Sequence, residues 1–215
     1  ATLYQLLSVT AEKHGHRKAV SYQILSGHKD RAETLTGRQF HETSTQAANL
    51  FRKLGVGETD VVAYILPNCN ETAITLIAGS VAGIANPINP LLDAEQIASI
   101  LRETKAKVVV TLKGFPRTDV PQKAAAAVAM APGVEVVLEV DLNRYLSPPK
   151  SWIVPLIRPK VETKHKARVL DFNAEVARQN RTLDFADSTT DRVAAYFHTG
   201  GTTGMPKVAQ HTYSG

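Results

Sequence analysis

Short runs of β-branched and other apolar residues alternate along this 215-residue chain with stretches that repeat apolar residues at helical spacing. The clearest runs are DVVAYIL (60–66), AKVVVTL (106–112), VEVVLEV (134–140) and DRVAAYF (191–197). Runs of this kind are typical of strands buried on both faces of a parallel sheet, and helices between them supply the crossovers. The sequence therefore predicts an α/β domain whose mostly parallel sheet is flanked by helices.

The other elements follow from periodicity and from start and stop signals. Asp93 is expected to cap one helix, and Gly55 is expected to end another. The predicted helices cover residues 3–11, 38–54, 71–83, 94–104, 120–131 and 167–180, and one further strand covers 18–25. The segment IANPINPLLD (84–93) contains two Asn-Pro pairs, which predict a rigid turn rather than a helix or strand element.

Composition excludes several classes of protein. An apolar fraction of 43% and a charged fraction of 21% are those of an ordered globular protein. The single cysteine, Cys69, excludes an internal disulfide and favours a reducing compartment, and no activating base lies beside it in the sequence. No apolar run approaches the roughly 20 residues that cross a bilayer, and no signal-peptide pattern is found. We therefore expect a cytoplasmic protein.

The net charge of +5 is concentrated after an apolar stretch. SWIVPLIRP (151–159) leads into RPKVETKHKAR (158–168), where five basic residues accompany one acid, Glu162. One interpretation is a peripheral contact between residues 152–168 and the inner face of an anionic membrane. The other is a surface excursion whose apolar part packs on the domain while its charges are solvated. Nucleic acid is not expected as a partner, because the basic run lacks interleaved aromatic residues and matches no reader motif.

The strongest functional signal lies in AAYFHTGGTTGMPKVAQH (194–211). Its glycines let backbone N–H groups approach a ligand closely, and its threonines add hydroxyl donors. Lys207 adds a mobile positive charge, and Pro206 stiffens the turn before it. The loop follows a predicted strand, and phosphate ligands sit beyond the carboxyl ends of strands in such sheets, so we expect a nucleotide triphosphate or pyrophosphate here. The candidate binding residues are Thr199, Gly200, Gly201, Thr202, Thr203, Gly204 and Lys207.

Two other kinds of loop share some of these features. A Walker-type phosphate loop requires glycine immediately before the lysine and serine or threonine immediately after it. Pro206 and Val208 occupy those positions, so that motif is excluded. A plain hairpin turn joining RVAAYF to VAQHTY remains open, because glycine and threonine are common in turns.

The stretch YFHTGGTTGMPK resembles the phosphate-binding signature of adenylate-forming (AMP-binding) enzymes, the superfamily of acyl-CoA synthetases, luciferases and peptide-synthetase adenylation domains. The signature, aromatic-x-x-T-S-G-T-T-G-x-P-K-G, is matched at Thr199, Gly201, Thr202, Thr203, Gly204, Pro206 and Lys207. LGVGETDVVAYILPNCNE and AGSVAGIANPINPLLDAEQI resemble further segments of the family. The resemblance spans nearly the whole chain, is weakest over 143–187, and is most similar to acyl-CoA synthetases in the N-P-I-N-P segment.

The chain also departs from the family pattern. Gly200 stands where serine is frequent, which removes a hydroxyl donor, and Val208 replaces the glycine after the lysine. Tyr213 occupies a position where histidine is common, and His211 lies two residues earlier. Since that histidine often shapes the wall of the acyl pocket in the family, the departure bears on the acid substrate more than on the triphosphate.

The resemblance implies a two-step reaction. A carboxylate attacks the α-phosphate of Mg-ATP to give an acyl-adenylate and pyrophosphate, and the thiol of coenzyme A then displaces AMP. ATP, Mg2+ and coenzyme A are thus the implied cofactors, and a carboxylic acid, fatty acids included, is the implied substrate. Lys207 would act as the catalytic residue by holding the β- and γ-phosphates with the loop, and no metal ligand is assigned.

The resemblance also implies a domain organisation. Residues 1–215 are expected to be the N-terminal fragment of the large adenylation domain, without the rest of that domain and the small C-terminal domain, and to be inactive alone. Two alternatives stay open: another adenylating branch, of the peptide-synthetase or luciferase-like kind, and a nucleotide-binding module without catalysis. The identity of the acid and the oligomeric state are not predicted.

Overall fold

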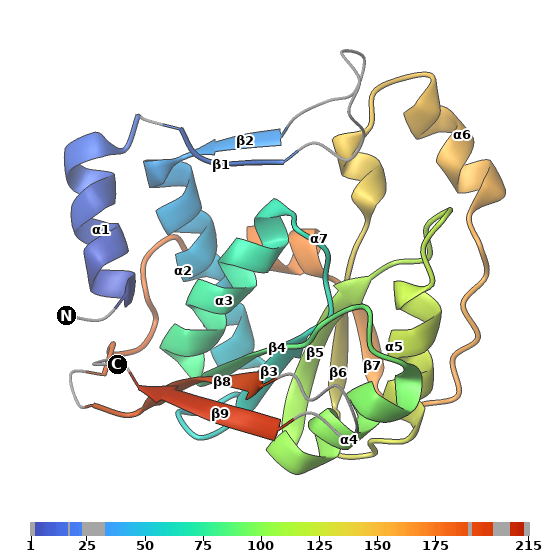
Figure 1. The fold of residues 1–215 in the computed structure, drawn as a ribbon. Coiled ribbons are helices and arrows are strands. Elements are labelled where there is room, and N and C mark those ends of the chain that lie inside the picture. Colours follow the sequence, from blue (N-terminus) through green and yellow to red (C-terminus); the bar gives the residue numbers. More distant parts are fainter. Residues whose placement is uncertain (1–2, 17, 23–32, 189–190, 200–206, 213–215) are drawn as a thin grey trace.

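A seven-stranded sheet organises the fold (Figure 1). The computed structural model describes residues 3–16, 18–22, 33–188, 191–199 and 207–212. The strand order is β7-β6-β5-β3-β4-β8-β9, and neighbours are parallel except β8 and β9. Its strands are β3 (Val61–Tyr64), β4 (Ile84–Pro87), β5 (Ala106–Leu112), β6 (Val136–Val140), β7 (Arg168–Asp171), β8 (Val193–Thr199) and β9 (Lys207–Thr212). A separate antiparallel pair joins β1 (Lys18–Tyr22) to β2 (Glu33–Thr36). The predicted α/β class with a mostly parallel sheet is confirmed.

Helices cover both faces of the sheet (Figure 1). They are α1 (Leu3–His14), α2 (Gly37–Lys53), α3 (Asn70–Ala82), α4 (Ala94–Thr104), α5 (Val120–Ala129), α6 (Lys150–Ile157) and α7 (Phe172–Ala177), with a 3-10 turn η1 (Leu142–Tyr145). α2 packs against α1, α3 and α7, whereas α4 packs against α5. The chain steps one way from β3 to β4 and the opposite way from β4 to β5. Because crossovers between parallel strands are as a rule right-handed, this reversal places the connecting helices α3 and α4 on opposite faces of the sheet.

Local capping signals fix the starts of two helices. At α2, Gln39 N–H donates to Thr36 Oγ1 at 3.2 Å, and Thr36 N–H donates to Gln39 Oε1 at 2.9 Å. At α4, Asp93 and Gln96 make the same reciprocal pair at 2.8 and 3.1 Å. Each pair satisfies backbone N–H groups that a helix leaves without an internal partner. The predicted cap at Asp93 is confirmed.

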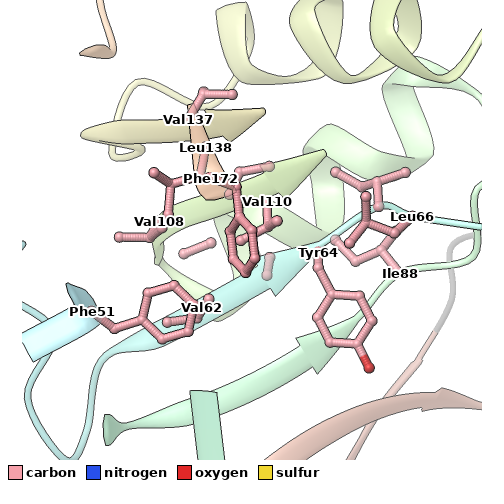
Figure 2. Packing of buried hydrophobic residues seen from close by; sticks show 14 of the residues in the cluster. Phe51, Val62, Tyr64, Leu66, Ile88, Val108, Val110, Val137, Leu138 and Phe172 are labelled. Atoms are coloured by element: carbon pink, nitrogen blue, oxygen red, sulfur yellow. The ribbon is translucent and has the colours of Figure 1, made fainter. Parts of the chain in front are cut away.

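The β-branched strand residues form the buried core. Figure 2 shows Val62 of β3 and Val108 of β5 in this cluster, together with the rings of Phe51 from α2 and Phe172 from α7. All four side chains are fully buried. Burying one such side chain is worth about 1.5–3 kcal/mol, so the strands and the helical layers stabilise each other.

Two sequence predictions were wrong. Residues 84–87 form the strand β4 and not a rigid turn, because Ile84 and Ala85 are buried between β3 and β8, and the ladder ends at Pro87, which has no N–H. The single helix predicted over 167–180 is replaced by β7 and the short α7. There the Asp171 carboxylate accepts the Ala174 N–H at 2.8 Å, so the helix starts only after the strand has paired with β6.

Candidate phosphate-binding site

The predicted phosphate loop connects β8 to β9. These strands pair antiparallel, with Thr199 opposite Lys207 in the register. The structure therefore brings the backbones of the first and last candidate residues together. Gly200, Gly201, Thr202, Thr203 and Gly204 lie outside the described residues, and their part in phosphate binding stays a prediction.

The hairpin stands at the carboxyl edge of the parallel sheet. β8 runs parallel to β4, so the carboxyl end of β8 shares an edge with the carboxyl ends of β3, β4, β5 and β6. Ligands in open α/β sheets bind at this edge, near the point where the strand order reverses. Here the reversal lies at β3, where β4 is the neighbour on one side and β5 the neighbour on the other. The location therefore suits a ligand site.

Asn86 ties β8 to the parallel sheet. Only Ala85 and Ala195 are in register between β4 and β8. The fully buried Asn86 adds a side-chain bond, because its Nδ2 donates to the Tyr196 carbonyl at 2.9 Å. This bond supplies a donor next to Pro87, which has no backbone N–H of its own to offer.

Arg192 fixes the start of β8. Its guanidinium donates to the carbonyls of Gly83, Ser80 and Val81 at 2.7, 3.0 and 2.9 Å. These carbonyls belong to the end of α3, where a helix carries a partial negative charge and lacks internal donors. Arg192 therefore anchors the hairpin at the end opposite to the loop.

His198 lies at the base of the loop, next to Thr199. Burial lowers the pKa of its imidazole, and the Pro87 backbone and the charge of Glu103 oppose that shift only in part. The imidazole is therefore neutral at neutral pH. In the candidate set, the positive charge for a polyphosphate comes from Lys207.

The sequence interpretation missed Asn86, Arg192 and His198. The Asn-Pro pair at 86–87 was a visible signal, but it was assigned to a turn. Arg192 lay inside a predicted strand and carried no local signal for its helix-end contacts.

A buried ionic cluster supports the carboxyl edge beside the candidate site. The fully buried Glu71, in the first turn of α3, accepts hydrogen bonds from Arg144 Nη1, from Tyr145 Oη at 2.5 Å and from Asn173 Nδ2 at 3.1 Å. Tyr145 Oη in turn accepts the Asn70 N–H at 3.1 Å. Burial and the neighbouring Glu71 carboxylate raise the pKa of the Tyr145 phenol, which remains a donor. The cluster thus joins α3, η1 and α7.

Cys69 precedes this cluster and is buried. Burial, reinforced by the charge of Glu71, raises the pKa of its thiol to about 12. Because the thiolate is the reactive form, its fraction at neutral pH is roughly a thousandfold below that of an ordinary thiol. We expect alkylation of Cys69 by iodoacetamide to be roughly a thousandfold slower in the folded chain than in urea, and to accelerate as the pH rises. Equal rates in the two states would contradict this assignment.

An apolar cavity of about 1040 Å³ opens at the same edge of the sheet. Pro67 after β3, Leu112 at the end of β5 and Leu142 after β6 line its inner side. Ile153 and Val154 of α6 close it from outside.

The described part of the chain brings no three His, Cys, Asp or Glu side chains together as metal ligands. Among the helices of that part, none is both long enough and apolar enough to cross a bilayer.

Comparison with known proteins now identifies the class. The sequence model of a family described as AMP-binding enzyme matches residues 7–215. The chain therefore belongs to the AMP-binding enzyme family, as the loop resemblance predicted.

Several CoA ligases are among the relatives that it matches. The chain is 31% identical over 216 residues to the marinolic acid–CoA ligase of Pseudoalteromonas sp. (strain SANK 73390), covering 100% of this chain and 30% of that protein. It is 29% identical to the long-chain-fatty-acid–CoA ligase of Bacillus subtilis (99% of this chain, 36% of that protein) and 26% identical to 4-coumarate–CoA ligase 1 of Arabidopsis thaliana (81% and 28%). The chain thus spans about a third of the length of these relatives.

A solved structure confirms the fold. The crystal structure of the anthranilate CoA ligase AuaEII in complex with anthranoyl-AMP matches with a TM-score of 0.74 at 19% identity. The match covers 99% of this chain and 35% of that chain.

Proposed function

We propose that the whole protein to which this chain belongs is an acid–thiol ligase that activates a carboxylic acid with ATP and passes the acyl group to coenzyme A. The chain would supply the N-terminal part of the large adenylation domain. The observation that carries this proposal is the pairing of Thr199 with Lys207 at the carboxyl edge of the parallel sheet, across a loop with the family's phosphate signature. The relatives named above support the choice of a CoA ligase over the other adenylating branches.

In this proposal the loop binds the triphosphate of ATP and stabilises its negative charge. The acid's carboxylate attacks the α-phosphate of ATP, the bond to the β-phosphate breaks, and pyrophosphate leaves. The loop N–H groups and threonine hydroxyls, with Lys207, hold the β- and γ-phosphates and stabilise the charge that builds up on the leaving group. Mg2+ enters as the ion carried by ATP. Since ATP and coenzyme A are the co-substrates, we place the reaction in the cytoplasm.

The test is ATP–pyrophosphate exchange by the whole protein in the presence of single carboxylic acids. Suitable acids are a long-chain fatty acid, 4-coumarate and anthranilate, which appear in the names of the ligases described above. We expect exchange that depends on one class of acid, followed by release of AMP when coenzyme A is added. The 215-residue chain alone is expected to give no exchange. If the whole protein bound ATP but showed no ATP–pyrophosphate exchange with any of these acids, a non-catalytic nucleotide-binding module would be favoured instead.

A further inference from the structure

The carboxyl end of β8 is held to β4 by side chains. In the described part of the chain, main-chain pairing between the two strands is limited to one residue pair, and Pro87 has no N–H with which to continue it. Beyond that pair, Asn86 Nδ2 donates to the Tyr196 carbonyl at 2.9 Å and lies 3.5 Å from His198 Nδ1. One amide group therefore contacts the last residues of β8 before the phosphate loop.

The Tyr196 carbonyl fixes the orientation of the Asn86 amide. If the amide turned over, its Oδ1 would face that carbonyl, and two acceptors would meet without a proton between them. The amide therefore keeps an N–H directed at His198 Nδ1. At 3.5 Å this contact is at the long end for a hydrogen bond, but it still disfavours an N–H on Nδ1. The neutral imidazole that fits here thus carries its hydrogen on Nε2.

The amide and the imidazole lie on the α4 face of the sheet and are closed off from solvent. Ala85 packs on α3, where a Cβ on Gly79 would lie 3.2 Å from Ala85 Cβ, so the next residue, Asn86, faces the other way. Asn86 is fully buried, and in the described part of the chain neither its Oδ1 nor His198 Nε2 has a partner or appreciable accessible surface. Protein that packs on the outside of this domain therefore cannot reach either atom without moving the groups that cover it.

These two unpaired atoms lower the stability of the fold. A buried donor or acceptor without a partner costs free energy, and apolar side chains of the same shape would avoid that cost. The bond to the Tyr196 carbonyl accounts for Asn86, but stability does not account for the imidazole of His198. A polar ring in this place, directly before the phosphate loop, therefore indicates a role in positioning that loop.

Protonation of His198 conflicts with this arrangement. The imidazolium has an N–H on both nitrogens, so two donors would face each other across the contact with Asn86. The Pro87 backbone of β4 and the charge of Glu103 on α4 favour the proton, and on β9 the uncharged Val208 stands opposite His198. Burial, the largest effect, opposes the proton and lowers the pKa of the held imidazole. Acid therefore favours a conformation in which the imidazole has left this place.

We propose that Asn86 and the neutral His198 position the carboxyl end of β8 for ATP, and that protonation of His198 weakens ATP binding. His198 directly precedes Thr199, whose backbone pairs with that of Lys207 across the phosphate loop. When the imidazole turns away from the amide, this strand end loses a side-chain connection to β4. Both are positioning residues, because they hold the loop from the covered side of the strand. This role rests on the proposed function, in which the loop binds ATP.

The test is the pH dependence of ATP affinity in the whole protein, measured by calorimetry at about pH 7.5 and about pH 5.5. In H198N the new amide oxygen replaces Nδ1 as the acceptor for Asn86 and does not titrate. The terminal phosphate of ATP itself has a pKa of about 6, so the wild type is compared with H198N at each pH. We expect the wild-type affinity, divided by that of H198N, to fall several-fold at the lower pH. About tenfold is the limit at one unit below the ordinary histidine pKa of about 6.5.

Two further variants separate the contact from other effects. H198F keeps a ring but removes the acceptor, so it should weaken ATP binding roughly three- to tenfold at about pH 7.5, whereas H198N should restore most of that loss. H165N changes another histidine whose pKa is lowered by burial. His165 lies beside β7, which four strands separate from β8, so H165N should keep the wild-type pH profile. Melting temperatures close to that of the wild type show that the variants are folded.

Two results would overturn this positioning role and leave the ligase proposal standing. One is a ratio of wild-type to H198N affinity that is the same at both pH values, and the other is a folded H198F that binds ATP as the wild type does. Absence of ATP binding by the wild type would overturn both proposals. Binding with the expected pH profile but without ATP–pyrophosphate exchange would support the positioning role and contradict the ligase.

Discussion

Replacing Lys207 by alanine in the whole protein is expected to slow formation of the acyl-adenylate by roughly two to three orders of magnitude, the usual cost of removing one preorganised donor to a developing negative charge. The expected cause is loss of the cation that stabilises the departing pyrophosphate. The second half-reaction, thioester formation from preformed adenylate, no longer involves those phosphates and should slow much less. ATP–pyrophosphate exchange measures the first half-reaction, and release of AMP from added acyl-adenylate measures the second.

The control for Lys207→Ala is Arg178→Ala. Arg178 is an exposed cation after α7 whose partner is Glu175, at 3.0 Å. This variant should leave both half-reactions unchanged. If Lys207→Ala slowed both half-reactions equally, Lys207 would not act by stabilising the departing pyrophosphate. The family assignment would be unaffected.

Replacing Glu71 by glutamine is expected to lower the free energy of unfolding by about 3 kcal/mol. The substitution keeps the size of the side chain but removes the charge that Arg144 pairs with, and breaking one side of a buried pair costs about 3–5 kcal/mol. The lower end applies because the Arg144 side chain is 33% exposed and water compensates part of the loss. Urea denaturation followed by circular dichroism measures the change.

Glu162→Gln provides the matched comparison. Glu162 faces Lys164 at 3.6 Å, and both side chains are largely exposed. An exposed pair contributes little, so this variant should change the free energy of unfolding by less than about 0.5 kcal/mol. If the two variants lost similar amounts, the Glu71 cluster would not contribute to stability as described.

The fold could be predicted from the sequence where a local signal was strong. β5 and β6 lie in long β-branched runs, and the cap at Asp93 needs only residues three apart. β4 could not be predicted, because its Asn-Pro pairs resemble a turn and its pairing with β8 joins residues 110 positions apart. Likewise α6 could not be predicted, because it contains Pro155, which cannot donate to the Ser151 carbonyl. The hydrogen bond that this carbonyl accepts instead comes from Asn143, outside the helix.

In the candidate site, too, some residues could be predicted from the sequence and others could not. The loop from Thr199 to Lys207 is a local pattern, so its residues and its family could be recognised from sequence alone. The side chains that hold its hairpin could not, because Asn86 and Arg192 act on segments more than 100 residues away. Sequence thus predicts the groups proposed to bind a ligand, and the structure adds the groups that position them.

The Glu71 cluster also bears on the order in which the chain folds. Glu71 is 73 residues from Arg144 and 102 from Asn173, so its bonds close two long loops of the chain. Closing such loops is entropically costly until the intervening strands have assembled. We therefore expect the cluster to form after the folding barrier has been crossed, so that it slows unfolding more than it speeds folding.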